Sequence, residues 1–138
     1  MLDANVAMKW VLAEPDSARA NALRGDFLGG VHELLAPDVF AAEIAHGLTR
    51  AERRKLLKPP QGKALLADVL ATCPHLHPFL PLLDRAFDIS SAHRHGLYDC
   101  LYIALAEQES CELVTADDKL IKNLKTRFPF IGSLAMLP

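Results

Sequence analysis

Two patterns of apolar residues recur along the chain, and together they predict helices alternating with short strands. Spacings of three and four residues predict helices at about 6–13, 17–23, 39–50, 61–70, 82–95, 97–108 and 117–125. Short runs of apolar and β-branched residues predict strands at 1–2, 33–36, 76–80, 112–115 and 130–137. This alternation is typical of parallel strands joined by helical crossovers, so the sequence predicts an α/β sandwich. In such folds the working residues gather at the carboxyl ends of the strands.

Composition narrows the class of protein. A chain of 138 residues with 51% hydrophobic and 23% charged residues is typical of one soluble globular domain, here residues 1–138. The formal net charge of −2 excludes a globally basic nucleic-acid coat protein. Three cysteines without CxxC spacing favour the reducing cytoplasm. We expect no membrane segment, because no apolar run is long enough and the start lacks the pattern of a signal peptide.

Asp99 is the most informative single residue. Nine of the ten positions from Leu97 to Ala106 are apolar or aromatic, which is typical of a buried helix. A carboxylate there carries a large desolvation cost, and no lysine or arginine follows within a turn or two. The alternatives are a distant arginine partner or a protonated carboxyl group. A metal or active-site role is the favoured interpretation.

Three further acids join Asp99 to make a set. Asp3 and Asp117 each follow a predicted strand, and Glu43 lies beside the apolar stripe of a predicted helix. Singly, they are ordinary turn, cap and border residues. Together they offer only oxygen ligands, which Mg²⁺ and Mn²⁺ prefer, and clustered carboxylates need a cation to offset their repulsion. The set therefore predicts a Mg²⁺ or Mn²⁺ site.

Four sequence blocks carry a resemblance to a known family. They are Leu2-Asp3-Ala4-Asn5-Val6 followed by Lys9-Trp10, Ala36-Pro37-Asp38-Val39 followed by Glu43, Tyr98-Asp99 with its alanine-rich continuation to Glu107, and Leu113-Val114-Thr115-Ala116-Asp117. In order and spacing the chain resembles the PIN-domain ribonucleases, in particular the VapC-type toxins of bacterial toxin–antitoxin pairs. One departure is that only Met1 and Leu2 precede Asp3, so either the true start lies upstream or the predicted first strand is unusually short.

The resemblance implies both a fold and an activity. The fold is an α/β/α sandwich around a short central parallel sheet, and the activity is metal-dependent endonucleolytic cleavage of RNA. Asp3, Glu43, Asp99 and Asp117 would be the catalytic and metal-binding acids. Asn5 and Thr115 would orient these carboxylates or a metal-bound water.

The resemblance also implies partners, namely an RNA substrate, a small cognate antitoxin protein and a second copy of the chain in a homodimer. An acidic site repels the RNA backbone, so basic residues elsewhere must bind it. Candidate RNA contacts are Arg50, Arg53, Arg54 and Lys55, and the alternative interpretation of this run is a solvated helix face.

Two other functions stay open on the sequence alone. The first is a PIN-like module that binds RNA or protein without catalysis, which a stabilising effect of Mn²⁺ through the acids would argue against. The second is a haloacid-dehalogenase-like phosphatase, which also carries an aspartate after its first strand. That family places a second aspartate two residues later, where this chain has Asn5.

Overall fold

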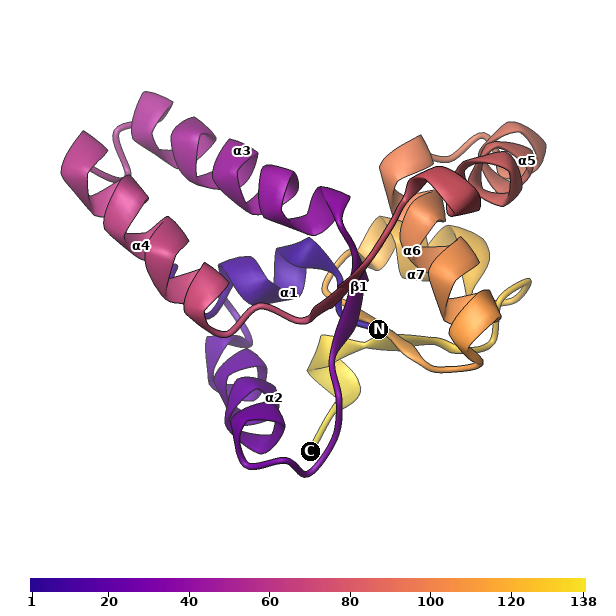
Figure 1. The fold of residues 1–138 in the computed structure, drawn as a ribbon, viewed down its shortest axis with the longest axis horizontal. Helices are drawn as coiled ribbons and strands as arrows, with labels where there is room; N and C mark the ends of the chain where they lie inside the picture. Colours follow the sequence, from indigo (N-terminus) through magenta and orange to yellow (C-terminus); the bar gives the residue numbers. More distant parts are fainter.

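Helices surround a short layer of parallel strands in the computed structural model, which describes residues 1–138 (Figure 1). The helices are α1 (Ala4–Met8), α2 (Ser17–Leu28), α3 (Val39–Arg53), α4 (Pro59–Ala71), α5 (Leu83–His93), α6 (Leu97–Glu109) and α7 (Asp118–Leu124). The strands are β1 (Leu35–Pro37), β2 (His75–His77), β3 (Leu113–Thr115) and β4 (Ile131–Ser133). Two 3₁₀ turns, Leu80–Leu82 and Leu134–Met136, complete the set. The expected α/β class is confirmed.

The first residues of the chain join two strand pairs into one layer. β1 pairs with β2, and β3 pairs with β4, both in parallel. Leu2 lies between the pairs, because its N–H donates to the Leu35 carbonyl at 2.8 Å while Val114 N–H donates to the Met1 carbonyl at 2.9 Å. The predicted first strand is therefore a single parallel bridge between Leu2 and Val114. All carboxyl ends of the layer meet at one edge.

Helix α6 runs through the core. Its residues 100–106 are all buried, as the apolar run predicted. Its first turn differs from the prediction of a wholly buried helix, since Tyr98 is 60% exposed and Asp99 is half-buried. This turn projects from the core toward the carboxyl edge of the strands. None of the helices combines the length and apolar character needed to cross a bilayer.

Several predicted elements have different bounds in the structure, and the first helix and two of the strands show why. The first helix begins at Ala4 rather than near residue 6, because the Asp3 carboxylate caps it by accepting from Asn5 N–H at 3.1 Å. That helix ends at Met8 instead of continuing to residue 13. The strand predicted at 76–80 is His75–His77, because residues 80–82 around Pro81 form a 3₁₀ turn. The strand predicted at 130–137 ends at Ser133 for a similar reason.

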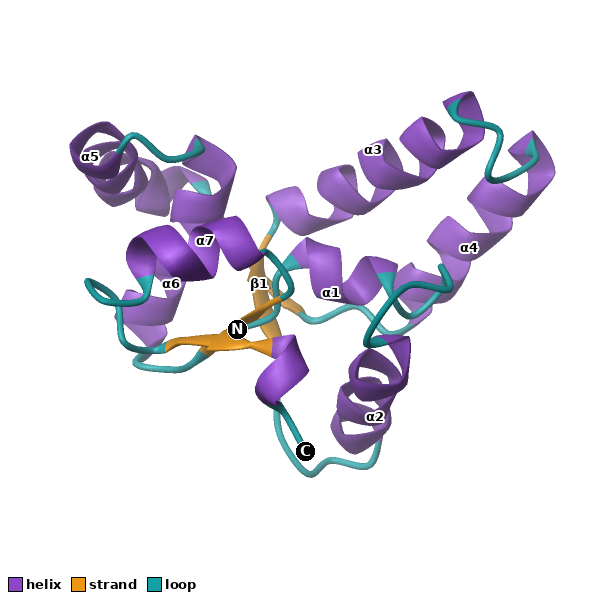
Figure 2. Cartoon of the chain, turned by 180° about the vertical axis from the view of Figure 1, so that it is seen from behind, coloured by secondary structure: helices purple, strands orange, loops and turns teal.

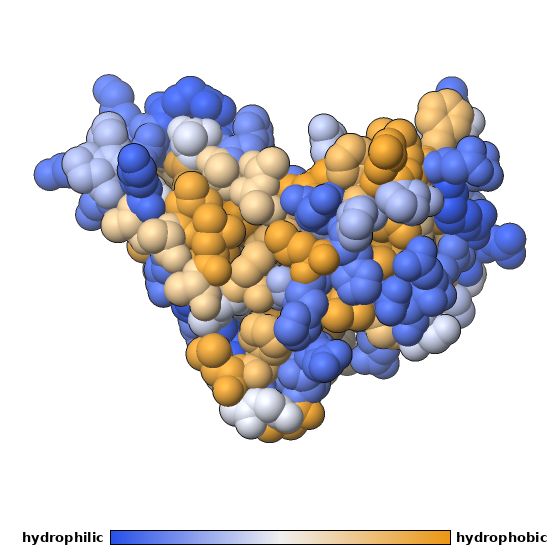
Figure 3. Space-filling model, viewed as in Figure 1, coloured by the Kyte–Doolittle hydropathy of each residue, from blue (hydrophilic) through white to orange (hydrophobic).

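The chain forms two arms with a hollow between them (Figures 1 and 3). Helices α3 and α4 make one arm, and α5 with α6 makes the other, as the view from behind also shows (Figure 2). Arg24 of α2 anchors the first arm, because it donates to Thr72 Oγ1 at 2.7 Å and forms an ion pair with Asp68 of α4 at 3.1 Å. The Arg24 guanidinium also lies 4.9 Å from the ring centre of Trp10.

Candidate active site

The four predicted acids lie at the carboxyl edge of the strand layer. Asp3 follows the bridge residue Leu2, and Asp117 comes two residues after β3 ends. Glu43 lies in the second turn of α3, the helix that follows β1, and Asp99 lies in the first turn of α6. Elements far apart in sequence therefore bring the acids to one side of the molecule, the arrangement that the strand pattern predicted.

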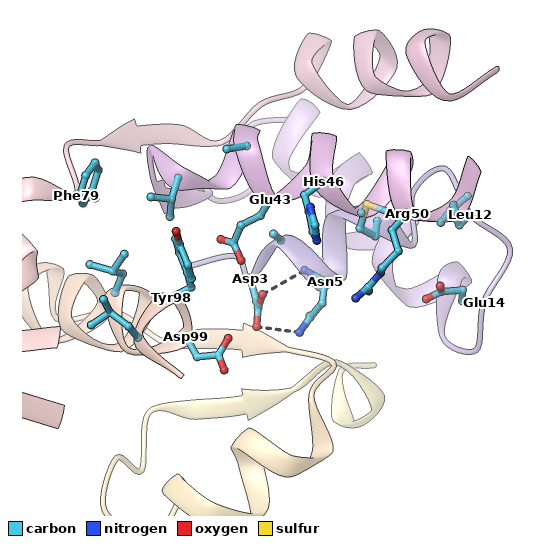
Figure 4. A pocket seen from close by; sticks show the side chains of 18 of the residues that line it. Asp3, Asn5, Leu12, Glu14, Glu43, His46, Arg50, Phe79, Tyr98 and Asp99 are labelled. Atoms are coloured by element: carbon cyan, nitrogen blue, oxygen red, sulfur yellow. Dashed lines mark hydrogen bonds between the residues drawn. The ribbon is translucent and has the colours of Figure 1, made fainter. Parts of the chain in front are cut away.

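Asp3 is buried in a network of hydrogen bonds. It is only 5% exposed, and its Oδ2 accepts from the Thr115 hydroxyl at 2.7 Å and from Asn5 Nδ2 at 2.9 Å (Figure 4). Asn5 Nδ2 also donates to Thr115 Oγ1 at 3.1 Å, and Asn5 Oδ1 accepts from Ala116 N–H at 3.0 Å. Asn5 and Thr115 therefore hold the Asp3 carboxylate from behind and link α1 to β3.

Thr115 extends this network to Asp117. The Asp117 N–H donates to Thr115 Oγ1 at 3.1 Å. Asp117 also caps α7, with its Oδ1 accepting from Lys119 N–H at 2.8 Å and Leu120 N–H at 3.1 Å. Both capping bonds use the same oxygen, so the Asp117 Oδ2 atom keeps its hydrogen-bonding capacity. The capping role and a role in the site are compatible.

Glu43 is held by a tyrosine that the sequence analysis missed. The Tyr102 hydroxyl donates to Glu43 Oε1 at 2.8 Å, and Tyr102 is only 1% exposed. A signal for this contact was present in the sequence, because a tyrosine in the middle of a buried helix needs a partner for its hydroxyl group. The bond joins α6 to α3 beneath the acids.

Asp99 is paired with a histidine that the sequence analysis also missed. His95 Nε2 lies 2.9 Å from Asp99 Oδ2, and the His95 side chain is 6% exposed. No lysine or arginine lies within a turn or two downstream of Asp99, whereas this histidine lies four residues upstream. Arg94 adopts a left-handed conformation, with φ 53°, and turns the chain between α5 and α6.

The acids perturb one another. Burial raises the pKa of Asp3 to about 7, against the hydrogen bonds from Thr115 and Asn5, and the charges of Asp99 and Glu43 raise it further. Burial also raises the pKa of Glu43, opposed by the Tyr102 hydrogen bond, and that of Asp99, opposed by His95. No lysine or arginine forms an ion pair with any of these acids or with Asp117. The charge of Lys119 lowers the pKa of Asp99 from beyond ion-pair distance, so the cluster has no directly paired lysine or arginine.

The donor set fits a hard divalent cation in its chemistry. The four acids, Asn5 and Thr115 offer carboxylate, amide or hydroxyl oxygen, the ligands of Mg²⁺ and Mn²⁺. The side chains are not gathered into one coordination sphere, because no three His, Cys, Asp or Glu groups lie close enough together to hold an ion. An ion held directly by three or more of these side chains would therefore require side-chain rotation.

The hollow between the arms is a cavity of about 1010 Å³. Its lining includes Asp3, Glu43 and Asp99, while Asp117 lies outside the lining (Figure 4). Tyr98 of α6 and apolar side chains of α1 and α3 line it as well. Of the four candidate RNA contacts, Arg50 and Arg54 line the cavity, whereas Arg53 and Lys55 do not.

The chain is therefore an α/β protein in which acidic side chains lie at the carboxyl edge of a short parallel strand layer, with helices around it. The chain belongs to the PIN domain family, which matches residues 1–125. The resemblance seen in the sequence is thereby confirmed, and the family favours a nuclease over the phosphatase alternative.

Several curated ribonucleases are similar to the chain over most of its length. Ribonuclease VapC12 of Mycobacterium tuberculosis H37Rv is 31% identical over 124 residues, which cover 89% of this chain and 90% of the relative. Ribonuclease VapC9 of the same strain is 34% identical over 110 residues, or 75% of this chain and 84% of the relative. Ribonuclease VapC3 of Pyrobaculum aerophilum is 31% identical over 99 residues, or 70% and 72%.

Proposed function

We propose that the protein is a Mg²⁺- or Mn²⁺-dependent endoribonuclease that hydrolyses RNA phosphodiester bonds. The observation that carries the proposal is the convergence of Asp3, Glu43 and Asp99 on one cavity, in a chain of the PIN domain family. The ribonucleases named among its relatives support the same activity. The non-catalytic binding module is the alternative that the experiment below tests.

Within this proposal, the chain's acids hold the cation and the residues behind them fix their positions. A divalent cation supplies positive charge beside the scissile phosphate and makes a coordinated water more acidic. Asp3, Glu43, Asp99 and Asp117 would hold it, each through a carboxylate on a different element. Asn5 and Thr115 would keep Asp3 oriented, as Tyr102 keeps Glu43 and His95 keeps Asp99. A raised pKa also suits a carboxyl group that receives a proton from water.

The test is cleavage of total RNA and of an oligonucleotide pool with Mg²⁺, Mn²⁺ or EDTA. We expect cleavage with metal, none with EDTA, and a loss of at least ~100-fold in Asp99→Asn and Asp117→Asn. Asp118→Asn is the matched control, because Asp118 is the exposed neighbour of Asp117 and should keep full activity. Circular dichroism and Mn²⁺-dependent thermal shifts report whether each variant folds and binds metal.

Absence of cleavage with every metal, together with no Mn²⁺-dependent rise in melting temperature, would contradict the proposal and favour the binding module. Equal cleavage by the Asp99→Asn variant and the wild-type protein would contradict the assigned site.

The proposal extends to two protein partners. As a toxin of a toxin–antitoxin pair, the protein would be inhibited by a small antitoxin, and it would form a homodimer. Exposed apolar side chains such as Leu80, at 69%, and Phe87, at 64%, offer contact area for a partner. We expect growth arrest when the chain is expressed without an antitoxin. We also expect light scattering to give twice its 15.2 kDa mass. Expression of an active enzyme without growth arrest would contradict the toxin role, and a monomeric mass would contradict the homodimer.

A further inference from the structure

One face of α3, together with its C-cap residue Arg54, carries a row of ionisable side chains into the cavity. Glu43, His46, Arg50 and Arg54 succeed one another at intervals of three, four and four residues, and all four line the cavity. These intervals keep the side chains on one face of the helix. At 1.5 Å per residue, Arg50 lies ~10 Å and Arg54 ~16 Å along the helix from Glu43. The row therefore leads away from the acids and changes from negative to positive.

The two guanidinium groups of this row have no partner. Neither Arg50 nor Arg54 makes a side-chain hydrogen bond or an ion pair, although both line a cavity that also holds Glu14. The Glu14 carboxylate is taken by Lys9, whose Nζ lies 3.1 Å away. By contrast, Arg24 and Arg85 both bind carboxylates. Arg50 points from α3 into the hollow beside Asn5 (Figure 4).

The two neighbouring cations, Arg53 and Lys55, also lack a side-chain partner but lie outside the cavity. Arg53 lies at the end of the same helix and is exposed, but it does not line the cavity. Lys55 follows the helix in a left-handed conformation, with φ 60°, and is also exposed outside the cavity. If a general excess of positive charge at this end of α3 bound an anionic ligand, all four residues would contribute equally. A binding site formed by the cavity would use only Arg50 and Arg54, which line it.

We propose that Arg50 and Arg54 form a phosphate track that binds the backbone of a single-stranded RNA on one side of the scissile phosphate. The proposal rests on the function proposed above and names how its substrate is held. The acids repel a polyanion, so the two guanidinium groups, which lie along α3 away from the acids, would contact phosphates removed from the cleaved bond. Guanidinium groups match phosphate in shape and offer paired donors.

The spacing and position of the two arginines favour a single-stranded RNA as the ligand. The two arginines are separated by about one helical turn, ~6 Å, and both face into a hollow between two arms. An unpaired strand can lay successive phosphates along this row while its bases turn toward the apolar lining. An acidic protein segment is the competing ligand, and the test includes it.

The test compares two doubly substituted proteins of equal net charge. Arg50→Gln with Arg54→Gln removes the track, and Arg53→Gln with Lys55→Gln is the matched control. Each pair is placed in an Asp99→Asn background, and affinity for a single-stranded RNA oligonucleotide is measured over a range of salt concentrations. We expect the track variant to lose ~10-fold or more in affinity and its salt slope to fall by ~1.4, since each lost phosphate contact on a single strand contributes ~0.7. The control should stay within ~2-fold of the background protein.

Three outcomes would overturn the track. They are equal losses in both variants, no loss in either, or a loss confined to binding of a polyglutamate peptide. Cleavage assays without the Asp99→Asn substitution separate the two proposals. If the wild-type protein cleaves RNA and both pairs behave alike, the track is wrong and the nuclease stands. If the wild-type protein neither binds nor cleaves RNA with any metal, the proposed function itself fails.

Discussion

The hydroxyl group of Tyr102 donates a 2.8 Å hydrogen bond to Oε1 of Glu43, across 59 residues of sequence. The bond couples the most deeply buried helix, α6, to α3, the wall of the cavity that carries Glu43. It also opposes the effect of burial on Glu43, since a donor to the carboxylate favours the ionised form.

Substitution of Tyr102 by phenylalanine should destabilise the fold and release Glu43. We expect the free energy of unfolding to fall by roughly 1–3 kcal/mol, because a buried hydrogen bond to a carboxylate is lost without creating a cavity. Urea denaturation measures the change. Tyr98→Phe, on the same helix but 60% exposed and without a hydrogen bond from its hydroxyl, should change stability by less than about 0.5 kcal/mol. Equal effects of the two variants would contradict the coupling.

Thr115→Val should strongly destabilise the protein, although the two side chains have nearly equal volumes. The Thr115 hydroxyl donates to Asp3 and accepts from Asn5 and Asp117, so valine leaves several buried polar groups without a partner. We expect a loss of roughly 2–4 kcal/mol in stability, together with loss of Mn²⁺-dependent stabilisation. Thr115→Ser retains the hydroxyl and should recover most of both. Thermal melts with and without Mn²⁺ check the pair, and a serine variant as impaired as valine would show that the methyl group matters instead.

The stability of the metal-free protein should fall as pH rises from about 4 to about 7. The folded state raises the pKa of Asp3 from 3.8 to about 7, so in this window it binds a proton that the unfolded state has released. The contribution of Asp3 is therefore favourable at low pH, is lost progressively up to about pH 7, and is constant above it. Urea denaturation in EDTA across this range should show a shallower decline for Asp3→Asn, which retains a side chain able to cap α1. Parallel pH profiles of the two proteins would be inconsistent with a protonated Asp3.

Arg24→Lys should destabilise the packing of α2 against the arm formed by α3 and α4. The guanidinium binds Thr72 and Asp68 at once and lies over the Trp10 ring, a geometry that a lysine ammonium does not reproduce. We expect a loss of about 1–2 kcal/mol by chemical denaturation. Arg85→Lys provides the comparison, because the Arg85–Glu107 pair is on the surface and should contribute less than about 1 kcal/mol. A larger effect at residue 85 than at residue 24 would argue against this anchoring role.

Strong local patterns predicted much of the fold. The helix expected at 97–108 extends from Leu97 to Glu109, and the strand expected at 112–115 is Leu113–Thr115. In both segments apolar burial and local propensity favour the same structure. The predictions were less accurate where two apolar residues flank a 3₁₀ turn, as around Leu80 and Leu134, because a short apolar run is compatible with either structure.

The acids were found by their unusual context, whereas their partners were not. Asp99 stands out as the one charge in an apolar run, a signal that is visible within a single helix. Its pairing with His95 depends on the reversal at Arg94, and the contact of Glu43 with Tyr102 depends on how two helices cross. Neither geometry is encoded by spacing within one element. Helical periodicity does not separate Arg53 from Arg50 and Arg54, because intervals of three and of four residues both keep side chains on one face, and only the position of the cavity makes this division.

The insertion of the first three residues between β1 and β3 has a consequence for synthesis on the ribosome. Asp3 is synthesised 112 residues before its hydroxyl partner Thr115. A nascent chain therefore cannot complete the acid network until β3 has been made, and contacts of such long range also form late in folding. Assembly of the site depends on synthesis of β3, so a prematurely terminated product that ends before β3 would lack both the strand that contacts Leu2 and the network that orients Asp3.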